Sequence, residues 1–219
     1  MPDSRLVVEL ENGCRGLTGQ VPAPQQLEQM TAYLELLRQW NQIYNLTAVR
    51  DPADMVSRHV LDSLAVLPWL PEQARLSLLD AGTGGGLPGI PLGIMRPSMS
   101  VTLLDSVGKK VRFLRHVKRT LGLNNIYPVQ ARLEQFALEH ATTRPFAGII
   151  SRAFSELAPF AHACRPLMDP KTRLYAMKGR LPDQEVEALP AWIRVEKIEK
   201  LSVPGLHEQR HLVIMSLFA

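Results

Sequence analysis

The sequence predicts an α/β fold, in which a mostly parallel, doubly wound sheet of Rossmann-like type ends in an antiparallel hairpin. Three observations predict this fold. Residues 1–71 show helical periodicity without a strand pattern. From residue 76 onward, short apolar runs alternate with helical segments, as in βαβ units. The last two strand-like runs have no helix between them. We therefore expect an N-terminal helical segment (1–71) packed on the core of a larger domain (72–219).

Composition limits the class of protein. The chain has 219 residues, of which 46% are hydrophobic and 21% charged, as expected for one globular domain with a small extension. Its two cysteines, Cys14 and Cys164, are too few for a disulfide framework or a four-cysteine zinc site. The sequence shows neither a signal-peptide pattern nor an apolar run of the roughly 18–20 residues that a membrane span needs. We expect a cytoplasmic monomer without a membrane partner.

The helical segment is expected to contain three helices. Residues 1–23 are rich in glycine, so we expect irregular structure there apart from a short helix at RLVVEL (5–10). Pro24 is well placed to open the second helix. That helix carries apolar residues at helical spacing, namely Leu27, Met30, Leu34, Leu37 and Ile43. Asp51 and Pro52 predict the start of a third helix, which runs to about Trp69.

The second part predicts five parallel strands and a hairpin. The five strand-like runs are LSLLD (76–80), VTLLD (101–105), IYPVQ (126–130), FAGIIS (146–151) and TRLYAMK (172–178). Helical segments follow them, ending near Met95 in the first case and otherwise covering about 109–119, 133–140, 156–165 and 183–189. The hairpin strands are expected at about 192–201 and 211–218. Right-handed crossovers should place helices on both faces of the sheet.

A glycine loop, Asp-Ala-Gly-Thr-Gly-Gly-Gly, follows the first strand. Gly82, Gly84 and Gly86 with Asp80 fit the acid-x-G-x-G-x-G pattern of S-adenosylmethionine methyltransferases. Gly84, Gly86 and Gly89 also fit G-x-G-x-x-G, the pattern of NAD-dependent oxidoreductases. A carboxylate at the end of the strand would repel a pyrophosphate and attract a sulfonium, so Asp80 favours the methyltransferase.

Three further residues follow strands at the edge where ligands bind in open α/β sheets. Asp105 can accept hydrogen bonds from ribose hydroxyls, or it can cap the next helix. Glu134 can approach an adenine ring, or it can complement a helix dipole. Arg152 follows the apolar strand GIIS, and its position favours a functional role over that of a surface arginine.

The segment KKVRFLRHVKR (109–119) is strongly basic. As a helix it would turn Phe113, Leu114 and Val117 inward and its cations outward. These cations form either a phosphate-binding face or an ordinary solvated face. The residues we assign to RNA binding are Lys109, Lys110, Arg112, Arg115 and Arg119.

The motif H-E-x-x-H, from His207 to His211, resembles the zinc motif of metalloproteases. Its context predicts a strand, in which residues four apart lie about 13 Å from each other. One zinc ion cannot bridge that distance, so we predict no metal.

Several blocks taken together resemble the RsmG family, also called glucose-inhibited division protein B, over about residues 25–215. The blocks are WNQIYNLTAVR (40–50), RHVLDSL (58–64), LLDAGTGGGLPGIPL (78–92), LLDSVGKKVRFL (103–114), SRAF (151–154), MKG (177–179) and RHLVIM (210–215). The resemblance implies a class I S-adenosylmethionine methyltransferase. Family members methylate N7 of a guanine, nucleotide 527, in the 530-loop region of bacterial 16S ribosomal RNA.

The resemblance also implies site residues. It assigns contacts with S-adenosylmethionine, and with its product S-adenosylhomocysteine, to Gly82, Leu87, Leu133, Glu134 and Arg152. The glycine loop and the strand ends add Asp80, Gly84, Gly86 and Asp105 as expected cofactor contacts. The implied partner is 16S rRNA or a small-subunit particle. Two departures from the family pattern are Ala147, where an Asp is common, and Lys109-Lys110, where Lys-Arg is common.

Guanine N7 has a lone pair and no proton, so its methylation needs alignment and no general base. N7 and O6 suit a bidentate cation, for which the candidates are Arg152, Arg58, Lys178 and Arg210. His59 and Asp62, three residues apart on a helix, can order the cap of the cofactor pocket. The alternatives are a NAD-dependent oxidoreductase, a small-molecule methyltransferase and a non-enzymatic RNA-binding module.

Overall fold

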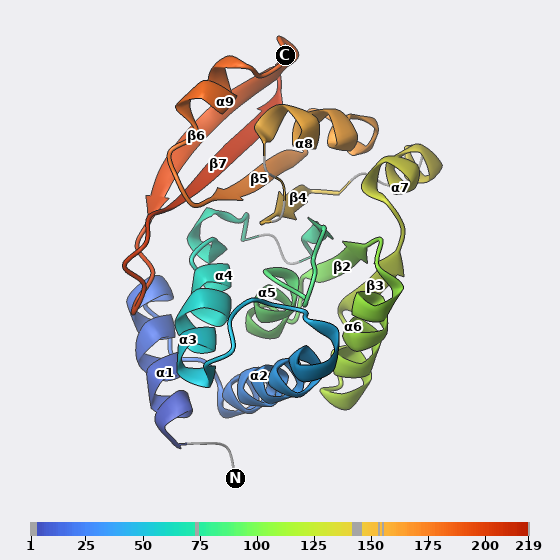
Figure 1. The fold of residues 1–219 in the computed structure, drawn as a ribbon. Helices are drawn as coiled ribbons and strands as arrows, with labels where there is room; N and C mark the ends of the chain where they lie inside the picture. The colour runs from blue at the N-terminus through green and yellow to red at the C-terminus, as the bar shows by residue number, and fades with distance from the viewer. Residues whose placement is uncertain (1–3, 73–74, 142–145, 153, 155, 219) are drawn as a thin grey trace.

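A seven-stranded sheet in the order β3-β2-β1-β4-β5-β7-β6 forms the centre of the molecule (Figure 1). The computed structural model describes residues 4–72, 75–141, 146–152, 154 and 156–218. Ala153 of the SRAF block therefore lies outside the described residues. The same holds for residues 1–3 of the expected N-terminal segment, and for residues 73–74 and 219 of the expected larger domain. The strands are β1 (Ser77–Ala81), β2 (Ser100–Asp105), β3 (Ile126–Gln130), β4 (Gly148–Ser151), β5 (Arg173–Lys178), β6 (Ile193–Leu201) and β7 (Arg210–Leu217).

The sheet confirms the predicted fold. Strands β1 to β5 pair in parallel, β7 pairs antiparallel to β5, and β6 forms an antiparallel hairpin with β7. The strand order changes direction between β1 and β4, because β2 and β3 lie on one side of β1 and β4 and β5 on the other. In open α/β sheets such a switch point opens a crevice at the carboxyl ends of the strands, where ligands bind.

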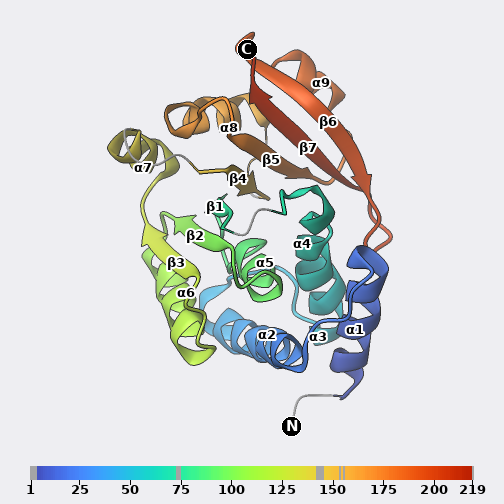
Figure 2. The same ribbon diagram turned by 180° about the vertical axis from the view of Figure 1, so that it is seen from behind.

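Helices cover both faces of the sheet, and Figures 1 and 2 show the two layers from opposite sides. The helices are α1 (Ser4–Thr18), α2 (Pro24–Tyr44), α3 (Pro52–Met55), α4 (Asp62–Leu64), α5 (Gly89–Met95), α6 (Gly108–Thr120), α7 (Leu133–His140), α8 (Leu157–Cys164) and α9 (Asp183–Glu187). Helices α1 to α6 lie on one side of the sheet and α7 to α9 on the other. None of the helices in the described part of the chain is long and apolar enough to cross a membrane.

Each face of the sheet has its own apolar core. On the first face, Leu37 of α2 and Phe113 of α6 share one buried cluster with Leu78 of β1. On the second face, Phe160 of α8 packs in a cluster with Ile149 of β4. The N-terminal helices thus bury their apolar residues in the same core as the sheet.

Three local expectations for the N-terminal helices were wrong. Helix α1 runs through Gly13 and Gly16, where we expected irregular structure; Gly13 lets the helix approach Leu61, whose Cδ2 would lie 2.6 Å from an added Cβ. Ile43, expected inside, is 74% exposed near the end of α2. The helix expected to run to Trp69 is interrupted by a π-helical turn over Val56–Leu61.

Candidate active site

The glycine loop makes a tight connection between β1 and α5. Gly82, Gly84 and Gly86 all have positive φ angles, of 73°, 61° and 95°, a region that favours glycine. At Gly86 an added Cβ would also overlap the side chain of Ile90. The N–H of Gly84 donates to Oδ2 of Asp105, 3.0 Å away, which ties the loop to the end of β2.

Asp80 stabilises this loop from inside. Its side chain is 0% exposed, and its Oδ2 accepts hydrogen bonds from the Thr83 hydroxyl (2.6 Å) and from the N–H of Gly89 (2.8 Å). Burial raises the pKa of Asp80 to about 6, although these hydrogen bonds and the charge of Arg152 act in the opposite direction. The expected carboxylate open to a cationic ligand is not observed, because the residue is enclosed by its own loop. The hydrogen bond from Gly89 also occupies the first N–H of α5.

Helix α2 supports the loop from the other side. The Tyr33 hydroxyl, fully buried, donates a 2.7 Å hydrogen bond to the carbonyl of Gly85. A Cβ at Gly85 would lie 3.1 Å from Leu37 Cδ1, so the helix and the loop are in close contact. Tyr33 was not predicted as part of the site, because nothing in the sequence links it to a loop 52 residues later.

A pocket of about 270 Å³ opens beside the loop, at the carboxyl ends of β1 to β4. We call it the glycine-loop pocket. It brings together four residues predicted to bind the cofactor: Gly82, Asp105, Leu133 and Glu134. Its walls also include residues that the sequence analysis did not select, among them Arg132 and Phe154. Arg132 directly precedes the predicted residue Leu133, and Phe154 is the last residue of the SRAF block. The other predicted residues, Asp80, Gly84, Gly86, Leu87 and Arg152, do not line it.

Asp105 joins the pocket to α6. Its Oδ1 accepts from the N–H of Val107 (2.9 Å), just before the helix starts, and its Oδ2 lies 3.4 Å from Nζ of Lys110. Lys110 therefore points into the glycine-loop pocket, and not out with the cations assigned to RNA binding. The other four assigned cations, Lys109, Arg112, Arg115 and Arg119, are exposed on α6. Phe113, Leu114 and Val117 are buried, as predicted.

A second pocket, of about 360 Å³, contains all four candidates for positioning the guanine. We call it the cation pocket. Arg152 follows β4, Lys178 ends β5 and Arg210 begins β7, while Arg58 comes from the π-helical turn. His59 and Asp62 also line it. Segments up to 152 residues apart in the sequence thus place four cationic side chains around one opening.

Asp62 organises this pocket. Its side chain is 2% exposed, and its two oxygens bind Arg152 (Nη1, 3.1 Å) and Arg210 (Nε, 3.0 Å). Arg152 Nη1 also donates to the carbonyl of Arg58, 3.1 Å away. One carboxylate therefore fixes two guanidinium groups, which keep further N–H groups for a ligand.

His59 contributes no charge to the pocket near neutral pH. Burial, with a smaller contribution from the charge of Arg152, lowers its pKa to about 4. Its Nε2 lies 2.8 Å from the Thr47 hydroxyl. The positive charge therefore comes from the arginines and Lys178.

The two pockets lie on either side of one short segment. After β4, Arg152 lines the cation pocket, and two residues later Phe154 lines the glycine-loop pocket. Both pockets therefore have a wall residue from the segment that follows β4. This arrangement suits a transfer reaction between two bound molecules.

A doubly wound sheet in the order β3-β2-β1-β4-β5-β7-β6, with β7 antiparallel and a glycine loop after β1, is the architecture of the class I S-adenosylmethionine-dependent methyltransferases. Solved structures support this fold. An O-methyltransferase from Bacillus cereus, crystallised with S-adenosylhomocysteine, has a TM-score of 0.59 and 16% identity, covering 85% of this chain and 91% of that chain. A SAM-dependent methyltransferase from Aquifex aeolicus has a TM-score of 0.56 and 18% identity, covering 78% and 96%.

The chain belongs to the GidB family, rRNA small subunit methyltransferase G, whose model matches residues 26–213. Relatives named ribosomal RNA small subunit methyltransferase G are about half identical to it. The protein from Escherichia fergusonii is 50% identical over 190 residues, which are 87% of this chain and 88% of the relative. Those from Salmonella arizonae and Escherichia coli K12 are 51% and 49% identical over the same shares. The predicted family is confirmed, which favours the methyltransferase pattern of the glycine loop over the oxidoreductase pattern.

Proposed function

We propose that this protein transfers a methyl group from S-adenosylmethionine to N7 of guanine 527 in 16S ribosomal RNA, in the cytoplasm. The observation that carries the proposal is the convergence of Arg58, Arg152, Lys178 and Arg210 on one pocket beside the glycine-loop pocket. The family supports a small-subunit rRNA as the substrate. The resemblance of the sequence blocks to the RsmG family supports the nucleotide and the atom.

The glycine-loop pocket fits the cofactor. Gly82 leaves the backbone open at its wall, Asp105 and Glu134 offer carboxylate oxygens for hydroxyl and amino groups, and Leu133 and Phe154 offer apolar surface for a ring. S-adenosylmethionine, when bound, supplies a methyl group on a positively charged sulfur. The residues of this pocket would hold that molecule.

The cation pocket would orient the guanine. Guanidinium groups pair in bidentate fashion with N7 and O6 of guanine, and Arg152 and Arg210 are both held at the pocket wall by Asp62. Because N7 has no proton, no residue needs to act as a general base. Nor is a cysteine nucleophile required, and burial raises the pKa of Cys14 to about 11 and that of Cys164 well above its usual value.

The exposed face of α6 would bind the RNA backbone. Lys109, Arg112, Arg115 and Arg119 point to solvent, and none of them forms an ion pair with another described residue. Unpaired arginines on one helix face are suited to phosphate groups. The helix begins at the glycine-loop pocket, through Lys110, so RNA bound along it would reach the site of transfer.

The direct test is methyl transfer to small-subunit particles that lack the modification. We expect 7-methylguanosine in the digested RNA, located at nucleotide 527, when the protein and radiolabelled S-adenosylmethionine are added. Arg152→Ala should largely abolish transfer while the protein stays folded. Label in another base, or on an exocyclic amine, would refute the proposed target.

The RNA face is tested by salt dependence. Replacing both Arg112 and Arg115 with alanine should reduce the slope of log affinity against log salt by about 1.4, since each contact with single-stranded RNA contributes about 0.7. The control is Arg38→Ala, because Arg38 is a surface arginine of α2 already paired with Glu35. An equal slope in the double variant and the control would contradict RNA binding by α6.

A further inference from the structure

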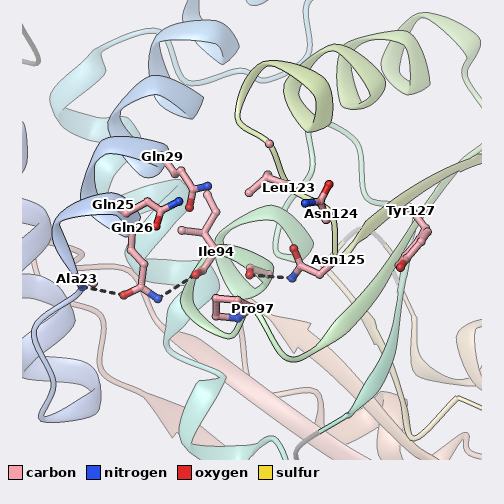
Figure 3. Close-up of a pocket in the computed structure, with 12 residues that line it drawn as sticks. Ala23, Gln25, Gln26, Gln29, Ile94, Pro97, Leu123, Asn124, Asn125 and Tyr127 are labelled. Atoms are coloured by element: carbon pink, nitrogen blue, oxygen red, sulfur yellow. Dashed lines mark hydrogen bonds between the residues drawn. The ribbon is translucent and has the colours of Figure 1, made fainter.

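The cavity of largest volume among those described lies far from the proposed site of transfer. It has a volume of about 610 Å³ and lies at the start of β3, whereas the glycine-loop pocket lies at the carboxyl ends of the strands. Its walls come from the start of α2, the end of α5 and the turn after α6 (Figure 3). None of the residues that line it carries a charge, and five of them are Gln or Asn: Gln25, Gln26, Gln29, Asn124 and Asn125.

Three of these amides hold the cavity in shape. Gln26 Nε2 donates to the carbonyls of Ile94 (3.0 Å) and Met95 at the end of α5. Asn125 Nδ2 donates to the carbonyl of Gly93 (3.0 Å), also in α5, and Gln29 Nε2 donates to that of Leu121 (2.9 Å) after α6. Since these bonds join α2, α5 and α6, the walls of the cavity are preformed.

The other polar groups are left for a ligand. No hydrogen bond to a described residue is recorded for the side chains of Gln25 and Asn124, and both are exposed. Figure 3 shows them on opposite walls, from α2 and from the turn after α6. Tyr127 is 47% exposed at the rim, and the Nζ of Lys118 lies 4.8 Å from the centre of its ring.

We propose that this cavity binds a nucleobase of the RNA substrate, in a strand that runs along α6 from the site of transfer. The proposal rests on the proposed function, in which α6 binds the RNA backbone. Lys110, near the start of α6, lines the glycine-loop pocket, and Gly122, just past its end, lines this cavity. The 13 residues of the helix span about 20 Å, and exposed cations occur along that length.

The chemistry of the cavity selects a base over a phosphate. Amide groups of Asn and Gln match the paired donors and acceptors of base edges, with adenine as the preferred partner. The Tyr127 ring offers a face for stacking, as aromatic residues do for unpaired RNA bases. The uncharged lining would not attract a phosphate, which the neighbouring Lys118 and Arg119 can bind instead.

The test measures binding to unmodified small-subunit particles at several salt concentrations. The variants are Tyr127→Ala and the double change of Gln25 and Asn124 to alanine. We expect each to weaken RNA binding about five- to hundredfold, the effect of losing one stacked base, without a change in the salt slope. Tyr127→Phe keeps the ring and should bind nearly as the wild type does. Gln42→Ala, an exposed amide near the other end of α2, is the matched control.

The outcomes separate this inference from the proposed function. Affinities of both variants within twofold of the control, with normal wild-type methyl transfer, would overturn the base site alone. A reduced salt slope in Tyr127→Ala would also overturn it, because that result assigns phosphate binding to this region. A wild-type protein that fails to bind the particle would overturn both the base site and RNA binding along α6.

Discussion

Removal of the Asp62 carboxylate tests whether this group positions Arg152 and Arg210. The side chain of Asp62 is 2% exposed, and it is the ion-pair partner of both arginines. In Asp62→Ala two guanidinium groups would lose their counter-ion at once. Their repulsion, together with that of Arg58, would spread the cation pocket apart.

The expected loss of stability in Asp62→Ala follows from the burial of its ion pairs. Removing one partner of a buried ion pair costs about 3–5 kcal/mol. Arg152 and Arg210 keep 28% and 21% of their side chains exposed, so water screens part of this loss. We expect Asp62→Ala to lower the free energy of unfolding by about 2–4 kcal/mol. Asp62→Asn keeps one acceptor oxygen and should cost about half as much.

Urea denaturation at pH 7 measures these free energies, and methyl transfer measures the function. The control is Glu35→Ala, which breaks the pair with Arg38, whose side chains are 49% and 39% exposed. Such surface pairs contribute about 0–1 kcal/mol. In Asp62→Asn we expect a higher KM for RNA with unchanged affinity for the cofactor. If Asp62→Ala is no less stable than Glu35→Ala, the positioning role is refuted.

Three further predictions concern the loop and the pH dependence. In Gly89→Ala the new Cβ would overlap Leu103 and lie 2.7 Å from Asp80 Oδ2, so we expect about 1–3 kcal/mol of destabilisation and weaker cofactor binding in calorimetry. Gly16→Ala, whose Cβ would meet only ordinary contacts at 3.7 Å, is the control. The pKa of Asp80 in the folded protein, about 6, exceeds its ordinary value of 3.8, so stability from this group falls as the pH rises between these values. Asp80→Asn should therefore gain about 3 kcal/mol relative to wild type between pH 4 and pH 7, measured by urea denaturation, and a constant difference would contradict this. For His59 the sign is opposite, because its pKa in the folded protein, about 4, lies below its ordinary value of 6.5. Its contribution to stability is lost as the pH falls through that range, and His59→Gln should remove this loss of stability.

The sheet could be predicted from the sequence because its signals are local. Each buried strand is a short apolar run bounded by turn residues, and the absence of a helix between β6 and β7 predicts a hairpin. The glycine loop was recognisable for the same reason. Positive φ angles favour glycine, so Gly82, Gly84 and Gly86 mark in the sequence the positions where the backbone adopts this conformation.

The contacts that position the site were not predictable, because they join distant segments. Tyr33 supports Gly85 across the core, and Asp62 meets Arg210 across 148 residues. Periodicity shows which face of a helix is buried, but it does not show which distant segment packs against that face. The sequence assigned Asp80 to the ligand for a related reason: a pattern places a carboxylate at the strand end without showing what surrounds it.

The π-helical turn over Val56–Leu61 has a consequence for how the cation pocket can change. The N–H of Asp62 bonds to the carbonyl of Ser57, five residues earlier, so the turn holds one residue more than an α-helical turn would. Deleting a single residue there would let the backbone relax to an ordinary helix. The extra residue is absorbed within this turn, so the segments on either side would keep their relative orientation. Arg58 and Asp62, both in the cation pocket, would then lie three residues apart on one helix face, so a single deletion between them should be tolerated better than an insertion.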